Sequence, residues 1–287
     1  MSRTVSSPLN VVAVRSIAGP NGGAGATTMR ELWRMMAHIY KAEGARGLFK
    51  GNMANSASSA PGKAIDFFAY ATFKGMLTGN GDREPTNVER LLAGSLAGMT
   101  SDTILYPLEV VSTRVTLEKG KYGNFMQAMM QIAKKEGVRG LYSGWGAAMI
   151  GVIPYAGISF GCYDILSAQY RKTMNVESAG ALPTLCIGFA SGWLASMLSF
   201  PMYSATVRLQ SGMVPALASG RQANLVSILT STVRTEGWKA LFNGWFPATI
   251  KIIPQAGASF VVYEMVKRRL DKANVLDSDD DHDDDER

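Results

Sequence analysis

Hydrophobic residues run through this chain in long stretches that no charged residue interrupts. Residues 143–163 and 178–207 contain no Asp, Glu, Lys or Arg. Each stretch reaches the roughly 20 residues that a membrane-spanning helix needs, and both are rich in Gly and Ser. A pair of buried helices in a large soluble core is the alternative interpretation. Because small residues at helix contacts are typical of membrane bundles, the pattern favours a membrane protein.

A threefold internal repeat organises the chain. Three segments align without gaps, and each has a proline ten residues after its first glycine: 51–70, 144–163 and 244–263. Glu-Gly stands eight residues before each of these glycines. Further upstream, a second proline is followed seven residues later by arginine, in the pairs Pro8 and Arg15, Pro107 and Arg114, and Pro201 and Arg208. A repeat of about 95 residues is far longer than a solenoid unit.

Each repeat predicts an apolar helix with a mid-span proline, then an amphipathic segment, then a second apolar helix. In hydrocarbon a proline is tolerated where neighbouring helices satisfy the carbonyl that it frees. We therefore expect an all-α membrane protein, a six-helix bundle with pseudo-threefold symmetry. The expected units are 1–80, 81–175 and 176–276, followed by a disordered acidic tail at 277–287. Because seven residues precede Pro8, the first helix is expected to be truncated, or its true start lies upstream.

Charge is divided unevenly between the body and the tail. The net charge is +6, but residues 277–287 carry eight acids and one base, so the rest of the chain carries +13. A basic body indicates an anionic partner or membrane surface. Two cysteines and two histidines indicate neither a disulfide framework nor a metal cluster. We find no nucleophile–base set or phosphate-binding glycine loop, so we expect a protein that is not an enzyme and needs no cofactor.

These motifs together resemble the mitochondrial carrier family. The family pattern P-x-[D/E]-x-x-[K/R]-x-[K/R], followed by [D/E]-G, is visible in all three repeats, and the resemblance covers the chain except for its tail. Stretches such as AGSLAGMTSDTILYPLEVVSTR and GVIPYAGISF are similar to the adenine-nucleotide cluster of that family, the ATP-Mg/phosphate and Brittle-type carriers. The resemblance implies a multi-pass protein of the mitochondrial inner membrane, with the plastid envelope as the alternative.

Orientation follows from the basic residues. Segments 15–50, 114–143 and 208–243 hold 16 bases and 5 acids, so the positive-inside bias puts them on one side. The resemblance makes this the matrix side. Phe49-Lys50-Gly51 begins a helix and is a candidate cardiolipin phosphate site, with ordinary helix capping as the equal alternative. The expected partners are therefore membrane lipids and a small anionic metabolite, without nucleic acid; a larger membrane complex also stays open.

The resemblance implies two gates, one at each side of the membrane. The matrix gate, normally a ring of ion pairs, occupies six positions here: Asn10, Ala13, Glu109, Ser112, Tyr203 and Thr206. Only one of these six residues is charged. The cytoplasmic gate retains Tyr70, Lys74, Tyr163, Asp164, Tyr263, Glu264 and Lys267, which predicts the ion pairs Asp164–Lys267 and Glu264–Lys74. The arginines are expected to pair within each repeat with Glu43, Glu136 and Glu236, as structural contacts beside Pro8, Pro107 and Pro201.

Because the matrix gate has lost its charges, we expect the ligand-free protein to rest open on the matrix side. A gate closed by ion pairs biases the equilibrium between two conformations. The cytoplasmic gate retains its charges, so it is expected to be the closed one. Tight packing of Ala, Ser and Thr at the neutral positions is the alternative that would close the matrix gate without charge.

Substrate contacts are implied twelve residues before each gate tyrosine. These positions are Ser58, Gly151 with Val152, and Lys251, with Tyr155 close by. Gly151 and Val152 resemble a flat apolar surface for a purine, whereas Ser58 stands where a nucleotide carrier usually has a base. A lysine at the bilayer centre is costly unless it faces water or a ligand, so Lys251 is the expected anion contact. Lys63, Asp66 and Asp102 are further cavity candidates, although Lys63 and Asp66 can neutralise each other.

Two functions remain open from the sequence. The first is a carrier that exchanges an anionic, adenine-nucleotide-like metabolite by alternating access. The second is a carrier-fold structural or accessory membrane subunit that has lost transport. The second function is favoured by three features: the loss of charge at the matrix gate, the serine at position 58 in place of a base, and the short first helix. Lys251 and the retained gate tyrosines favour the first.

Overall fold

A computed structural model gives the fold of the chain. It describes residues 2–19, 26–79, 83, 85–118, 124–176, 180–212, 224–259, 261–262, 264–265 and 267. The acidic tail at 277–287 and the gate residue Tyr263 lie outside the described residues. The described part is predominantly helical, and the expected all-α fold with three repeats is confirmed.

The helices follow the order that the repeat predicts. The first repeat contains α1 (Ser2–Val5), α2 (Ser7–Ala18), α3 (Met29–Leu48), α4 (Asn52–Ala57) and α5 (Ser59–Thr78). The second contains α6 (Asn87–Leu117), α7 (Phe125–Leu141) and α8 (Trp145–Met174). The third contains α9 (Ala181–Ser211), α10 (Leu225–Glu236), the 3-10 helix η1 (Trp238–Phe242) and α11 (Trp245–Ile250), with helical residues again at 252–259.

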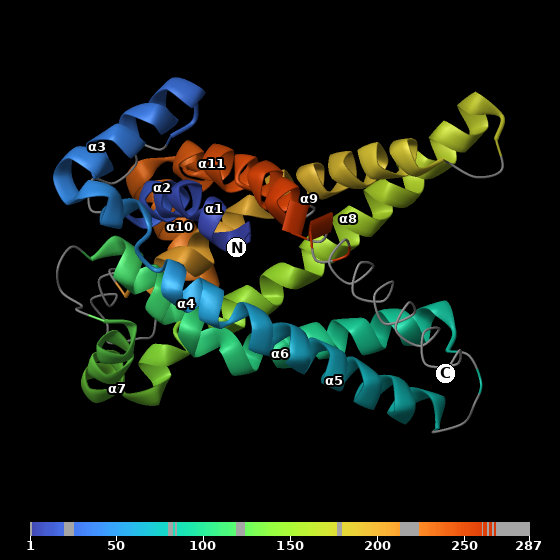
Figure 1. The fold of residues 1–287 in the computed structure, drawn as a ribbon, viewed down its shortest axis with the longest axis horizontal. Helices are drawn as coiled ribbons and strands as arrows, with labels where there is room; N and C mark the ends of the chain where they lie inside the picture. The colour runs from blue at the N-terminus through green and yellow to red at the C-terminus, as the bar shows by residue number, and fades with distance from the viewer. Residues whose placement is uncertain are drawn as a thin grey trace, which may run out of the picture.

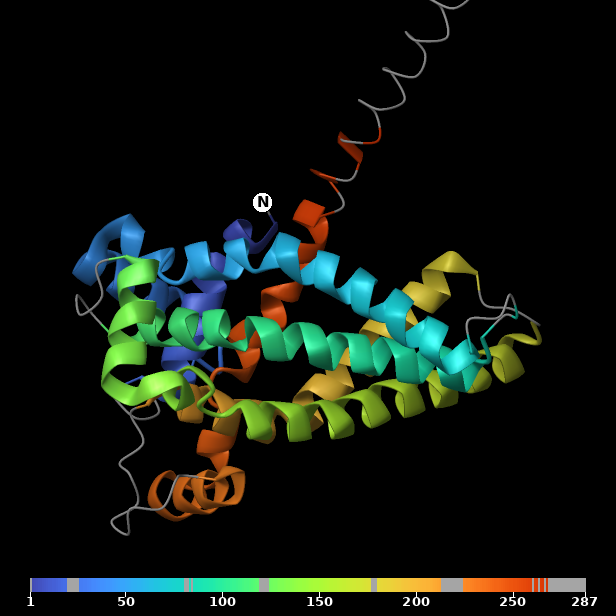
Figure 2. The ribbon, with the colours of Figure 1, turned by 90° about the horizontal axis from the view of Figure 1, so that it is seen from below.

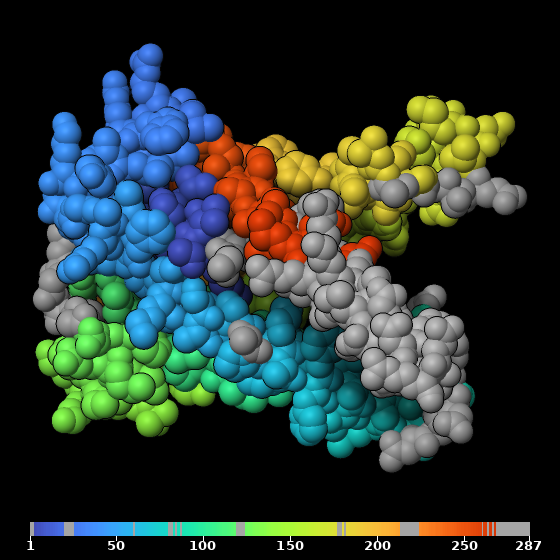
Figure 3. Space-filling view, in the orientation of Figure 1, coloured from blue at the N-terminus to red at the C-terminus, as the bar shows by residue number. Residues whose placement is uncertain are grey.

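Long helices of neighbouring repeats pack as hairpins. Figure 1 shows α5 beside α6 and α8 beside α9, with the far ends of the two hairpins separated. The amphipathic helices α3, α7 and α10 lie at the opposite end, as Figure 2 also shows. We call this the basic end, because it holds the base-rich segments of the sequence, and we call the end where the hairpins separate the mouth. Figure 3 shows an open gap between the far ends of the two hairpins.

The repeats meet in cyclic order at the basic end. The backbone of Gly51 has φ +74°, and a Cβ there would lie 2.5 Å from Thr116 Oγ1 of α6. At Gly244, φ is +82° and a Cβ would lie 2.7 Å from the Ala13 carbonyl of α2. Only glycine adopts this backbone readily and leaves the room for such an approach. Each repeat therefore begins its second apolar helix against the proline helix of the next repeat.

Prolines shape the apolar helices differently in the three repeats. Pro107, Pro154 and Pro201 lie inside the continuous helices α6, α8 and α9. In repeats 1 and 3 the hydrogen-bonded helix is interrupted at Ser58 and at Lys251, three residues before Pro61 and Pro254. Proline lacks the N–H that would continue the ladder. Two described helices, α8 and residues 182–211 of α9, are long and apolar enough to cross a membrane.

Candidate functional site: a two-lobed central cavity

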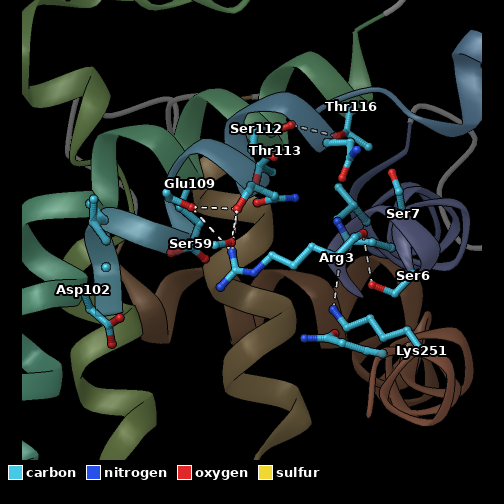
Figure 4. A pocket seen from close by; sticks show the side chains of 18 of the residues that line it. Arg3, Ser6, Ser7, Ser59, Asp102, Glu109, Ser112, Thr113, Thr116 and Lys251 are labelled. Atoms are coloured by element: carbon cyan, nitrogen blue, oxygen red, sulfur yellow. Dashed lines mark hydrogen bonds between the residues drawn. The ribbon is translucent and has the colours of Figure 1, made fainter. Parts of the chain in front are cut away.

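The larger lobe of the central cavity is polar. It has a volume of about 440 Å³ and is lined by α1, α2, α4, α5, α6, α9 and Lys251. Three basic and three acidic side chains line it: Arg3, Lys63, Lys251, Asp66, Asp102 and Glu109. In Figure 4, Arg3, Glu109 and Lys251 come from different helices and project toward the same space. Charges from several repeats therefore converge on one site.

The smaller lobe is apolar and lies against α8 and α9. Its volume is about 320 Å³, and its lining includes Gly151, Val152, Tyr155 and Phe200. A Cβ at Gly151 would come no closer than 3.7 Å to Met202 Cβ, so this glycine leaves a flat wall without being needed for packing. Glu109, Tyr203 and Lys251 line both lobes. A ligand with an aromatic part and a polar part thus has a suitable lobe for each, joined at these three residues.

Lys251 lies at the junction of the two lobes and has one described hydrogen bond. Its ammonium donates to Asn10 Oδ1 of α2 over 2.9 Å. Asn10 is neutral, so the positive charge of Lys251 has no carboxylate partner in the described part of the chain. The sequence reasoning singled out both residues, one as a substrate contact and the other as a gate residue, and the structure brings them together.

Arg3 is a cavity residue that the sequence reasoning missed. Its guanidinium donates to the Asn55 carbonyl over 2.9 Å and lies 3.5 Å from Ser58 Oγ. Ser58 itself donates to the Asn55 carbonyl. A positive charge therefore stands beside the serine that replaces the usual base. The signal in the sequence was an arginine five residues before the motif proline Pro8.

The two remaining lysine and aspartate candidates neutralise each other. Lys63 forms an ion pair with Asp66 over 3.0 Å across three residues of α5. Asp102 of α6 lines the same lobe and is exposed to the cavity. Lys63 is thus less available to an anion than Lys251 or Arg3, which have no described carboxylate partner.

Neutral residues close the basic end. Ala13, Ser112 and Thr206, the three positions expected for gate lysines, are 0%, 4% and 6% exposed. Ser112 donates to the Gly51 carbonyl over 3.0 Å. Asn10, Glu109 and Tyr203, the positions expected for gate acids, line the cavity instead. The helices α2, α6 and α9 contact one another at this end.

The expected resting state was therefore wrong for this structure. The basic end, which was expected to be open, is closed, and the mouth is open. The reason is that small side chains and backbone carbonyls allow the three proline helices to approach closely without ion pairs. Tight packing of neutral residues replaces the missing charges.

Gln210 is a second residue that the sequence reasoning missed. Its side chain is 1% exposed, accepts a hydrogen bond from Thr113 over 3.0 Å and donates to Tyr106 and Glu109 over 3.2 Å. A hydrogen-bond network centred on the neutral Gln210 side chain thus joins α6 to α9 at the wall of the cavity. The available signal was a glutamine nine residues after Pro201, at the end of an otherwise uncharged helix face.

The three motif arginines lie against the three glutamates that the sequence paired with them. Arg15 and Glu43 are joined by two hydrogen bonds of 2.8 and 3.0 Å. Arg114 contacts Glu136, and Arg208 contacts Glu236, in the same two-bond geometry. Hydrogen bonding from Arg15, with a smaller contribution from Lys50, lowers the pKa of Glu43 to about 2. Hydrogen bonding from Arg208 likewise lowers the pKa of Glu236.

Lys50, the basic residue of the candidate lipid site, is engaged within the protein. Its ammonium lies 2.8 Å from Glu43 Oε2. This ion pair accounts for Lys50 without a lipid, so a lipid phosphate would have to compete with Glu43. Gly51 in turn is required by the close approach of α6.

The gate residues at the mouth lie apart. Lys74, Asp164 and Lys267 are exposed, and Tyr70, Tyr163 and Glu264 are half-buried. The two predicted ion pairs, Asp164–Lys267 and Glu264–Lys74, are not formed between these described residues.

Comparison with known proteins gives a consistent family. A model of the "Mitochondrial carrier protein" family matches residues 1–81, 83–173 and 177–274. The "Adenine nucleotide transporter BT1, chloroplastic/mitochondrial" of Arabidopsis thaliana is 35% identical over 279 residues, which is 96% of this chain and 68% of that protein. The BT1 protein of Zea mays is 37% identical over 278 residues, 94% of this chain and 61% of that protein.

A human protein is also similar to most of the chain. The human "Mitochondrial adenyl nucleotide antiporter SLC25A24" is 34% identical over 235 residues, 81% of this chain and 49% of that protein. The chain thus spans about half to two thirds of the length of the relatives that it matches.

Proposed function

The chain belongs to the mitochondrial carrier family, a family of transporters and not of enzymes, and we propose that it exchanges an adenine-nucleotide-like anion across the mitochondrial inner membrane by alternating access. The observation that carries the proposal is the two-lobed cavity, whose polar and apolar lobes meet at Lys251. The printed names of the relatives, adenine nucleotide transporters and antiporters, agree with such a ligand.

Each lobe would hold one part of the nucleotide. The purine would lie in the apolar lobe against Gly151, Val152 and Tyr155, and the phosphate would lie in the polar lobe. Lys251 would be the dominant anion contact, with Arg3 as a second base beside Ser58. A desolvated anion needs compensating charge, and an ammonium near the bilayer centre gains most from facing a ligand.

The charge of the cavity limits the charge of the substrate. Lys63 is paired with Asp66, so Lys251 and Arg3 supply two positive charges, while Glu109 and Asp102 add negative charge to the same lobe. A free nucleoside triphosphate carries three to four negative charges, more than this lining compensates. The preferred substrate is therefore a nucleoside monophosphate or a magnesium complex.

Both ends of the chain would face away from the matrix, and cardiolipin at the basic end would stabilise the carrier.

Uptake by proteoliposomes tests the proposal. The purified full chain is reconstituted in liposomes loaded with AMP, and entry of radiolabelled AMP, ADP and ATP is measured with and without Mg²⁺. We expect exchange of AMP that Lys251→Ala lowers at least tenfold, because the anion loses its central contact. The matched control Lys134→Ala removes an exposed lysine of α7 and leaves uptake unchanged. Absence of exchange with all three nucleotides would overturn the proposal and favour a carrier-fold accessory subunit.

A further inference from the structure

Equivalent hydrogen bonds join the repeats at two of the three interfaces between them. At the interface between repeats 1 and 2, Arg15 Nε donates to the Thr116 carbonyl over 2.9 Å. At the interface between repeats 2 and 3, Arg114 Nε donates to the Gln210 carbonyl, also over 2.9 Å. In both cases the acceptor lies nine residues after the motif proline of the next repeat. The repeat symmetry therefore predicts a third bond, from Arg208 to Ile17.

The third bond is missing. Arg208 Nε is buried and has no hydrogen-bond partner among the described residues. The interface between repeats 3 and 1 is instead held by an apolar cluster in which Val14 and Ile17 of α2 meet Phe200 and Val207 of α9. A buried donor without a partner is costly, so this interface is closed less favourably than the other two.

One polar bond crosses that interface at the level of the cavity. Among the side-chain hydrogen bonds that the structure describes, Lys251 to Asn10 is the one that joins repeat 3 to repeat 1. The other two interfaces each have several polar bonds, and none of these bonds involves the ammonium that is proposed to bind the anion: Arg15 to Thr116, Ser112 to Gly51, Arg114 to Gln210 and Thr113 to Gln210. The interface with the fewest polar contacts is thus the one that the binding residue itself holds closed.

We propose that the Lys251–Asn10 bond is a ligand-released latch and that the basic end opens first between repeats 3 and 1. This inference rests on the proposed function, since it takes the ligand to be an anion that binds Lys251. When the anion accepts the hydrogen bond of Lys251, the bond between Lys251 and Asn10 breaks. The interface between repeats 3 and 1 then keeps the apolar contacts between α2 and α9. Binding in the cavity is thereby converted into opening at the basic end, because the ligand binds better to the state in which Lys251 is free of Asn10.

The identity of Asn10 sets the strength of the latch. The neutral asparagine oxygen and an anionic phosphate compete for the ammonium of Lys251. The phosphate is the stronger acceptor, because hydrogen bonds between two charged groups are stronger than those with one charged partner. An aspartate at position 10 would form an ion pair with Lys251, occupy its charge and repel the ligand. Asn10→Asp is therefore expected to tighten the latch, whereas Asn10→Ala removes it.

Thiol labelling at two interfaces tests the latch without transport. In a full-length background with Cys162→Ser and Cys186→Ser, a reporter cysteine is placed by Ala13→Cys at the repeat 3–1 interface or by Ser112→Cys at the repeat 1–2 interface. Both positions are buried, at 0% and 4% exposure. Labelling of the purified protein by a water-soluble maleimide is measured with and without AMP, in combination with Asn10→Ala, Asn10→Asp and Lys251→Ala. Val14→Cys replaces Ala13→Cys where the latter does not fold.

We expect Asn10→Ala to raise labelling at position 13 at least threefold without ligand and to change position 112 less than twofold. Lys251→Ala should have the same effect, and the double variant should add nothing further, because both changes remove one bond. Asn10→Asp should slow labelling at position 13. Asn55→Ala changes an asparagine of the same cavity whose described hydrogen bonds all involve its backbone, and it should leave labelling unchanged.

AMP separates failure of the latch from failure of the proposed function. Addition of AMP should raise labelling at position 13 in the protein with Asn10 and add nothing in Asn10→Ala. An unchanged rate at position 13 in Asn10→Ala, or equal increases at both positions, would overturn the latch. Faster labelling at position 13 in Asn10→Ala, without any response to AMP in the protein with Asn10, would support the Lys251–Asn10 bond as the latch. It would contradict the proposal that a nucleotide releases the latch.

Discussion

The two ends of the bundle carry equivalent gate positions, yet they are in opposite states. At the basic end, five of the six gate positions are neutral, and the helices are closed around Ala13, Ser112 and Thr206. At the mouth, charged residues are retained, and Lys74, Asp164 and Lys267 are exposed and apart. The number of charges at a gate therefore does not tell whether it is closed.

What closes the basic end is hydrogen bonding to backbone carbonyls. Arg15, Arg114 and Ser112 donate to carbonyls of a neighbouring repeat, and Gln210 joins α6 to α9. These bonds are buried or partly buried, so salt screens them weakly. Exposed ion pairs, in contrast, contribute about 0–1 kcal/mol and weaken with salt. The comparison predicts large effects of substitution at the basic end and small ones at the mouth.

The largest effect is expected for Arg114→Ala. Arg114 is 2% exposed and binds Glu136 and the Gln210 carbonyl. Its loss leaves a buried carbonyl unpaired and should lower the free energy of unfolding by about 3 kcal/mol. For a chain of this size the apparent melting temperature should fall by about 5 °C, measured by intrinsic fluorescence in detergent. Arg139→Ala, an exposed arginine of α7, is the control; equal shifts in both variants would contradict the role of the interface.

Glu43→Gln should lower stability by about 2 kcal/mol at pH 7. Its folded pKa of about 2 lies below the ordinary value of 4.5. The stabilisation that the ionised Glu43 carboxylate gives the folded state is therefore fully present above about pH 4.5. It is lost as the pH falls toward about 2. The difference in melting temperature between the protein with Glu43 and Glu43→Gln should shrink between pH 5 and pH 3. A difference that stays constant over this range would show that Arg15 and Lys50 do not lower this pKa.

A smaller loss, about 1–2 kcal/mol, is expected for Gln210→Leu, because the variant leaves Thr113 and Glu109 without their buried partner. Thermal unfolding measures it, with Gln169→Leu on the exposed face of α8 as the matched control. The loss should be nearly the same at 50 and 500 mM salt. Strong salt dependence would indicate that attraction between charges, rather than hydrogen bonding by Gln210, closes this interface.

The smallest effect on stability is expected at the mouth. Asp164→Asn should change the free energy of unfolding by less than about 0.5 kcal/mol, because Asp164 is exposed and has no described ion-pair partner. If the pair with Lys267 forms when the mouth closes, AMP exchange should slow about 1.5- to 5-fold, as the loss of an exposed pair implies. Lys267→Ala should slow exchange equally, with no further loss in the double variant. Additive effects would show that the two residues do not pair.

The sequence by itself determined the repeat and the fold class, and it singled out Lys251, Ser58 and Gly151, which line the cavity. The offset of seven residues from Pro8 to Arg15 and the offset of eight residues from Glu43 to Gly51 recur in all three repeats, and such spacing indicates the same local structure in each repeat. The apolar stretches indicated the membrane, and a lone Lys251 in such a stretch indicated the cavity. These inferences succeed because helix periodicity and the cost of charge in hydrocarbon are local properties of the chain.

Only the tertiary structure decided which gate is closed, that Arg3 stands beside Ser58, and that Lys251 binds Asn10. Arg3 and Ser58 are 55 residues apart, and Lys251 and Asn10 are 241 residues apart. Nor did the repeat pattern reveal that Arg208 lacks the bond that Arg15 and Arg114 make. Closure depends on how closely neutral helices approach and on which carbonyl meets which donor. Those distances arise from packing between repeats, which the spacing within one repeat does not fix.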